Sequence, residues 1–79
     1  MDYRALQIML NYIRKQVSGE FEIFTVWKAK ILNNCKYIFK VDRIDGRIYE
    51  LTYNGQKNEW YLDAYEKLEN IVIEEEEDE

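Results

Sequence analysis

The 79-residue sequence contains no histidine and no proline, one cysteine and three glycines. Without histidine the chain lacks the commonest general acid or base, and it lacks the usual ligand sets of a zinc site. The single Cys35 cannot form an internal disulfide, and no histidine is present to activate it as a nucleophile. We therefore expect a non-enzymatic protein with no catalytic residue, no cofactor and no metal.

Long apolar runs are also missing. No stretch approaches the roughly 20 residues of a membrane-spanning helix, and the amino terminus has no basic segment followed by an apolar run and a cleavage site. We expect a cytoplasmic protein that does not contact a membrane. Hydrophobic residues make up 47 % of the chain and aromatic residues 15 %, enough for one modest core.

The carboxyl terminus carries a block of charge of one sign. The last six residues are all acidic: Glu74, Glu75, Glu76, Glu77, Asp78 and Glu79. Residues 1–73 hold all 11 Lys and Arg and one acid fewer, whereas the whole chain has a net charge of −5. A block of like charges buries too little apolar surface to offset the entropy lost on ordering. We predict a single domain over residues 1–73 and a disordered acidic tail over 74–79, available to a basic partner surface.

Apolar spacing predicts a helix at the start of the chain, with Asp2 as its cap and Ser18-Gly19 as its stop. Apolar residues recur every three or four positions at Leu6, Met9, Leu10, Ile13 and Val17.

From Phe21 the apolar period changes to two, which is typical of strands. In the first strand, Ile23, Thr25, Trp27, Ala29 and Ile31 fall on one side. The second strand presents Tyr37, Phe39 and Val41, and the third, over residues 47–53, presents Tyr49, Leu51 and Tyr53. Three-residue loops over 33–35 and 44–46, with Gly46 in a left-handed bulge position, would pair Trp27 with Val41 and Phe39 with Leu51. They would also place Lys40 opposite Glu50, outside the core.

The remaining segments predict a short strand at 59–62, a helical turn from Asp63 through Leu68, and an apolar edge strand or anchor at 71–73. We predict an α+β fold in which the amino-terminal helix packs on a three- to four-stranded antiparallel meander. A short carboxyl-terminal helix and the disordered acidic tail complete it.

The face of the sheet turned away from the helix is a candidate partner-binding surface. It is predicted to hold Phe24, Val26, Lys28, Lys30, Lys36, Ile38 and Lys40. Lysines on an open face also serve solubility alone, and the nearly neutral head argues against strong direct binding of nucleic acid. Trp60, Tyr61 and Tyr65 either close the core or form an exposed anchor.

A head of residues 1–73 ending in Glu74–Glu79, with this use of Ile, Lys, Glu and Tyr, resembles small accessory proteins that bind the B-family replicative DNA polymerase of crenarchaea. The resemblance implies an archaeal, thermophilic source, a role in DNA replication and a tail that modulates strand displacement by a polymerase. One alternative is a viral or phage inhibitor that mimics nucleic acid. Another is a nucleic-acid-binding domain that uses Lys28, Lys30, Lys36 and Lys40, with the tail as internal competitor. The oligomeric state stays open.

Overall fold

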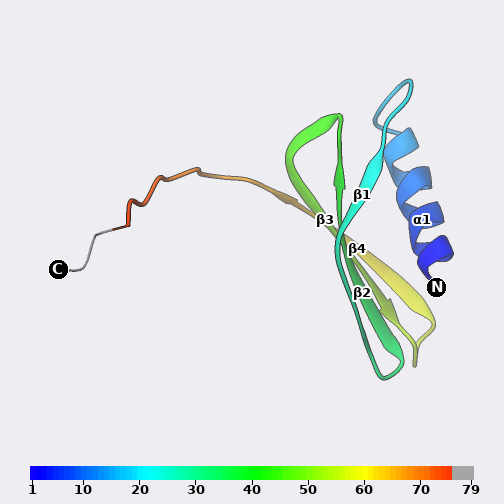
Figure 1. Ribbon diagram of the computed structural model, residues 1–79. Helices are drawn as coiled ribbons and strands as arrows, with labels where there is room; N and C mark the ends of the chain where they lie inside the picture. The colour runs from blue at the N-terminus through cyan, green and yellow to red at the C-terminus, as the bar shows by residue number, and fades with distance from the viewer. Residues whose placement is uncertain (76–79) are drawn as a thin grey trace.

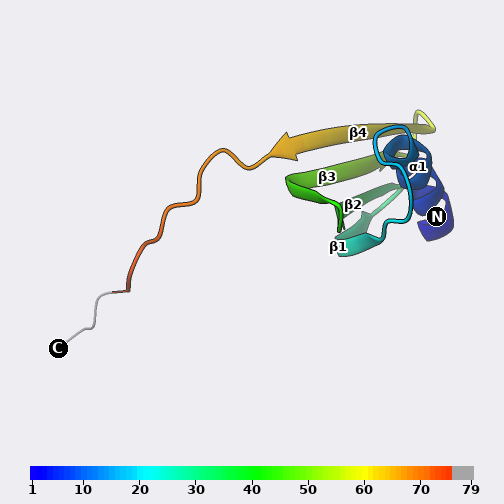
Figure 2. The same ribbon diagram turned by 90° about the horizontal axis from the view of Figure 1, so that it is seen from above.

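A computed structural model describes residues 1–75, and it contains one helix followed by four strands (Figure 1). The elements are α1 (Asp2–Arg14), β1 (Ile23–Ile31), β2 (Asn34–Val41), β3 (Ile44–Asn54) and β4 (Glu59–Glu66). The strands form one antiparallel sheet in the order β1-β2-β3-β4, and α1 lies on one side of it (Figure 2). The predicted α+β class and the antiparallel meander are confirmed.

Helix α1 packs on the sheet through a narrow stripe. Ala5, Met9 and Ile13 are buried and recur every four residues, so they lie on one face of the helix. The expected cap was wrong: Met1 is the N-cap residue, and Asp2 is the first residue of the helix. The helix ends at Arg14, before the predicted stop, and Gly19 adopts a positive φ of 84° in the loop that follows.

The core lies between α1 and the inner face of the sheet. Its buried residues are Ala5, Met9, Ile13, Cys35, Tyr37, Phe39, Val41, Tyr49 and Leu51. Trp60 packs against this core, with its ring centroid 4.8 Å from that of Tyr53. One face of β2 and β3 therefore supplies all the fully buried core residues that come from the sheet, as the alternating pattern predicts.

The register between β1 and β2 differs from the prediction. Only Leu32 and Asn33 form the turn, because Leu32 adopts a left-handed φ of 55°. In the second half of β1, the shorter turn exchanges the inward-facing and outward-facing residues relative to the prediction. Lys28 therefore pairs with Tyr37, and Trp27 pairs with Ile38. A bulge at Val26 returns the residues of the first half of β1 to their predicted faces, and Thr25 pairs with Phe39. The predicted pairing of Trp27 with Val41 on the inner face was therefore wrong.

Between β2 and β3 the predicted faces hold but the partners shift by two residues. Tyr37 pairs with Leu51, and Phe39 pairs with Tyr49. The turn consists of Asp42 and Arg43, and an irregularity beyond it absorbs the extra residues of β3. Gly46 has the predicted positive φ, at 75°. The expected pairing of Lys40 with Glu50 was wrong, because Glu50 lies opposite Ile38.

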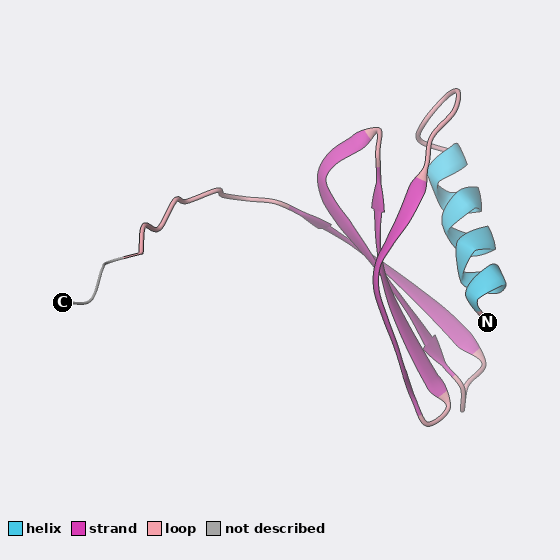
Figure 3. Ribbon diagram, viewed as in Figure 1, coloured by secondary structure: helices cyan, strands magenta, loops and turns pink. Residues whose placement is uncertain are grey.

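The predicted carboxyl-terminal helix was also wrong. Residues 59–66 all belong to β4, which pairs with β3 from Asn54–Glu59 to Arg47–Glu66. Alternation continues through Asp63 and Tyr65, so these residues extend the strand instead of beginning a helix. Residues 67–75 contain no helix or strand (Figure 3).

Candidate interaction face

The face of the sheet turned away from α1, called the open face below, is built by the alternation of all four strands. Residues paired across antiparallel strands point to the same side, so the register fixes its members. They are Phe24, Trp27, Ala29, Ile31, Lys36, Ile38, Lys40, Ile48, Glu50, Thr52, Tyr61, Asp63 and Tyr65. No element of residues 1–75 covers this face, which Figure 2 shows on the side of the sheet away from α1.

Large apolar side chains dominate the open face. Trp27 is 48 % exposed, Tyr65 is 53 % exposed and Ile31 is 70 % exposed. Phe24, Ile48 and Tyr61 are exposed as well, and Ile38 is half-buried among them. The face is therefore an apolar and aromatic surface that includes residues from every strand.

The charges on the open face are of both signs and partly compensate. The Nζ atom of Lys36 lies 3.5 Å from Oε1 of Glu50. At one margin, Tyr61 donates a 2.6 Å hydrogen bond to a carboxylate oxygen of Glu59. This bond raises the pKa of the Tyr61 phenol, because ionisation would place two negative charges side by side. Lys40 and Asp63 complete a mixed set, which suits a protein surface better than a polyanion.

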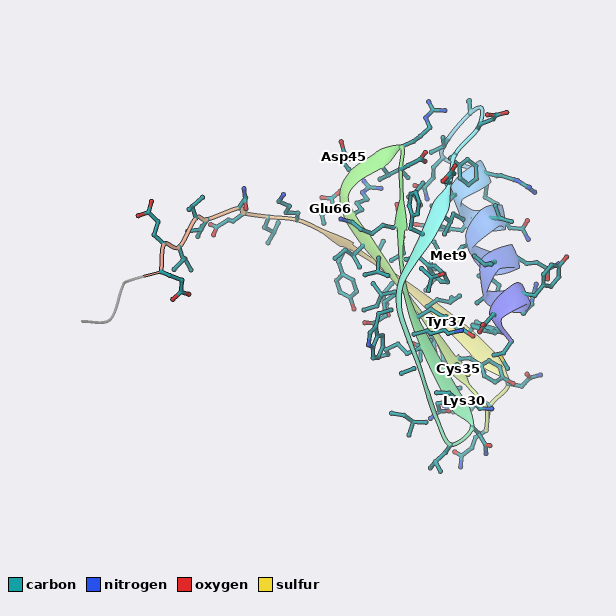
Figure 4. All side chains as sticks on the ribbon, viewed as in Figure 1. Met9, Lys30, Cys35, Tyr37, Asp45 and Glu66 are labelled. Atoms are coloured by element: carbon teal, nitrogen blue, oxygen red, sulfur yellow. The ribbon has the colours of Figure 1, made fainter. Side chains whose placement is uncertain are left out.

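Two of the predicted site lysines lie on the opposite side of the sheet. Lys28 pairs with Tyr37, and Lys30 pairs with the buried Cys35, so both lysines belong to the helix side. Figure 4 labels Lys30 and Cys35 at the same end of the sheet. The Nζ atom of Lys28 lies 2.8 Å from Oδ2 of Asp2, and Tyr37 donates a 2.7 Å hydrogen bond to Oδ1 of Asp2. The cluster ties the first turn of α1 to β1 and β2.

This cluster shifts the pKa values of its members. The hydrogen bond from Lys28, then that from Tyr37, holds the pKa of Asp2 below its usual value. Burial, then the bond to Asp2, raises the pKa of Tyr37 far above its usual value. Lys28 thus has a structural partner within the domain.

The predicted site is therefore divided by the structure. Phe24, Lys36, Ile38 and Lys40 share the open face, whereas Val26 lies in the bulge with no partner in β2. Trp60 closes the core, and Tyr61 and Tyr65 lie on the open face. Sequence reasoning missed Trp27 and Ile31, because alternation alone does not reveal a bulge at Val26. It also missed Ile48, which lies opposite Tyr65.

Residues 67–75, called the C-terminal arm below, leave the end of β4 and lead away from the sheet (Figures 1 and 3). The N–H of Lys67 still donates a 2.6 Å hydrogen bond to the carbonyl of Gly46. Beyond it, Leu68, Ile71, Val72 and Ile73 are 69–92 % exposed. Of the predicted disordered tail, Glu74 and Glu75 belong to the arm, and residues 76–79 lie outside the described residues.

Residues 1–75 contain neither a metal-ligand cluster nor a membrane-spanning helix. No group of three or more Cys, Asp or Glu there has an arrangement that could hold a metal ion. No helix in this part of the chain is long and apolar enough to cross a membrane. The one cysteine, Cys35, is buried in the core.

No curated protein and no solved structure matches the chain significantly. A family model does match it, over residues 3–75, and that family is described as one of unknown function (DUF6275). The match includes α1, all four strands and the C-terminal arm. The chain therefore belongs to the DUF6275 family.

Proposed function

We propose that the chain is a non-enzymatic accessory protein, whose open face docks on a protein partner and whose acidic tail acts on a nearby basic, nucleic-acid-binding surface. The observation that carries this proposal is the exposure of Trp27, Tyr65 and Ile31 on one uncovered face. Contiguous exposed apolar surface on a small domain favours association, and Trp and Tyr are enriched among the residues that dominate binding energy.

The chemistry of the open face indicates the kind of partner. On the central strands β2 and β3, Ile38 and Ile48 lie beside the ion pair of Lys36 and Glu50. The large aromatic residues of the face lie on the outer strands β1 and β4. A protein surface that carries apolar groups together with a few polar groups of both signs complements this pattern. A nucleic acid does not, because only Lys36 and Lys40 are basic there and Lys36 is close to Glu50. The use of Lys28, Lys30, Lys36 and Lys40 as one nucleic-acid surface has less support, since two of them lie on the helix side.

The tail supplies the second half of the proposal. Six consecutive acids carry the excess negative charge of the chain, whereas residues 1–73 are nearly neutral. At physiological salt a charge acts over about 8 Å, so the tail needs a tethered partner to exert its effect. Docking by the open face would provide that tether at a high effective concentration. A replicative DNA polymerase, whose basic channel holds DNA, is the partner that we propose first.

The test is primer extension through a downstream duplex by the replicative polymerase of the source cell. Four proteins are compared: wild type, a variant with residues 74–79 neutralised to Gln and Asn, the double variant Trp27→Ser and Tyr65→Ser, and Tyr3→Ser. Tyr3 is an exposed aromatic residue of α1 and serves as the control for surface substitution.

We expect wild type and Tyr3→Ser to change strand displacement equally. The neutralised variant should bind the polymerase within about tenfold of wild type but lose most of the effect, since charges at the margin of a complex add little residence time. The open-face variant should lose binding. Equal behaviour of wild type and the neutralised variant at low salt would leave the tail only a solubility role. Complete block of the polymerase, instead of altered displacement, would favour the nucleic-acid-mimicking inhibitor.

A further inference from the structure

The C-terminal arm contains a short segment with strong strand propensity and no strand partner among the described residues. Ile71, Val72 and Ile73 are consecutive β-branched residues, each 69–85 % exposed. Glu74 and Glu75 follow directly, and the sequence continues with four more acids. An apolar segment of strand type followed by acids is suited to adding to an open sheet edge with basic residues beside it.

The sheet of this same protein offers two edges, and they differ in charge. β4 contains three acids, Glu59, Asp63 and Glu66, and no base. β1 contains two lysines, Lys28 and Lys30, and no acid. An arm that ends in acids is repelled by the edge at β4 and attracted by the edge at β1.

The first part of β1 is equal in length to the segment Ile71–Ile73, and its backbone has hydrogen-bonding groups that point away from the sheet. The bulge at Val26 leaves Ile23–Thr25 as a regular three-residue edge, equal in length to Ile71–Ile73. The carbonyl of Glu22 accepts a hydrogen bond from the N–H of Asp42 toward β2. Because backbone groups alternate in direction along a strand, the N–H and C=O groups of Ile23 and Thr25 point outward, away from β2.

We propose that Ile71–Ile73 of one copy of this chain add as a fifth strand to Ile23–Thr25 of a second copy, with reciprocal exchange of the arms forming a two-fold symmetric dimer. The arm leads away from its own sheet in both views (Figures 1 and 2), and β4 and β1 are opposite edges. Reciprocal exchange closes the assembly at two copies. This inference uses the edge of β1 and does not rest on docking by the open face.

Charge fixes the direction of the added strand. Glu20 and Glu22 precede β1, whereas Lys28 and Lys30 lie in its second half. A parallel arm directs its acids toward the lysines, and an antiparallel arm would direct them toward the glutamates. In the parallel register Val72 lies beside Phe24; its N–H donates to the carbonyl of Ile23, and its carbonyl accepts from the N–H of Thr25.

The first experiment measures the mass of the full-length protein in solution by sedimentation velocity over a range of concentrations. We expect a dimer whose dissociation constant rises with salt. In this dimer the acids that follow Ile73 lie near Lys28 and Lys30 of the second copy, and salt screens their attraction. Val72→Pro removes the central N–H donor and should raise the dissociation constant at least about tenfold. Val72→Thr keeps the branched shape and the donor and is the matched control. Tyr65→Ser, on the open face at the far edge, should also leave the dimer intact.

The second experiment locates the contact by disulfide formation in a Cys35→Ala background. One protein carries Phe24→Cys and another carries Val72→Cys, and the two are mixed. Neighbouring strands lie about 4.8 Å apart, within the range that a disulfide bridges. We expect a cross-linked species containing one copy of each, which only contact between molecules produces.

Three results would overturn the proposal. The first is a monomer at every concentration, which would mean that the arm pairs with its own sheet or binds another protein. The second is a dimer that Val72→Pro does not weaken. The third is a dimer in which the mixed single-cysteine proteins fail to cross-link, since that dimer would use another surface.

Discussion

At the scale of single residues, Asp2 connects the first turn of α1 to the sheet through Lys28 and Tyr37. The ion pair is exposed on both sides, so solvent screens it and its contribution to stability is modest. Its position gives it a defined role nonetheless. It anchors the end of the helix that has no side-chain cap.

This cluster predicts a dependence of stability on pH. The folded-state pKa of Asp2 lies below 3.8, so the unfolded chain binds more protons as the pH falls. The stabilisation is present above about pH 4 and is lost as the pH falls through the folded-state pKa. We expect Asp2→Asn to lower the melting temperature at neutral pH, and the two melting curves to converge in acid. Lys28→Met, which removes the largest cause of the shift, should reduce the same difference. Parallel curves at all pH values would contradict this role.

Tyr49 provides a second prediction at this scale. Its ring is fully buried and meets the ring of Tyr12 edge to face. Its hydroxyl makes no well-aligned hydrogen bond among residues 1–75, and the polar group beside it is the Arg47 guanidinium, whose pKa it raises. A buried polar group without a partner loses its hydration without compensation. Tyr49→Phe should therefore raise the free energy of unfolding by about 1 kcal/mol, measured by urea denaturation. Tyr37→Phe removes a hydroxyl that bonds Asp2 and should lower the free energy of unfolding. A loss of stability in both variants would show that Arg47 bonds the Tyr49 hydroxyl.

At the scale of elements, the sequence predicts the strands well, but it does not predict the lengths of the turns between them. Alternation identified the strands and the inward face of β2 and β3, because their inward residues are aromatic or aliphatic in sequence steps of two. It also placed Phe24, Lys36, Ile38 and Lys40 together on the open face. Turn length and the bulge at Val26 depend on backbone conformation, which Leu32 does not reveal, since leucine rarely adopts a positive φ. The second half of β1, with Trp27 and Ile31, was misplaced for this reason.

The same turn predicts a stabilising substitution. Leu32 is 88 % exposed and holds a left-handed φ of 55° at the first position of a two-residue turn, where glycine is favoured. Leu32→Gly removes this strain and should raise the free energy of unfolding by up to about 1 kcal/mol. Leu32→Ala, which keeps a Cβ atom, is the control and should bring no gain. A gain of equal size in both variants would point to the exposed leucine side chain instead of the backbone.

At the scale of the whole molecule, negative charge is concentrated at one end of the chain. Because the head is nearly neutral, few counterions would be released on contact with DNA. We expect the full-length protein to bind single- and double-stranded DNA weakly at physiological salt, as measured by fluorescence anisotropy. A protein ending at residue 73 should remain a weak binder. Submicromolar, salt-sensitive binding by the truncated protein would instead establish the tail as an internal competitor.

Because every strand pairs only with its neighbours in sequence, the meander also bears on the speed of folding. Its three hairpins close short loops, so little chain entropy is lost before the first strand contacts form. Proline is absent, so no slow isomerisation of a prolyl bond delays the unfolded chain. The domain should refold in a single fast phase, and the fraction of time that its apolar strands spend exposed during synthesis should be correspondingly small.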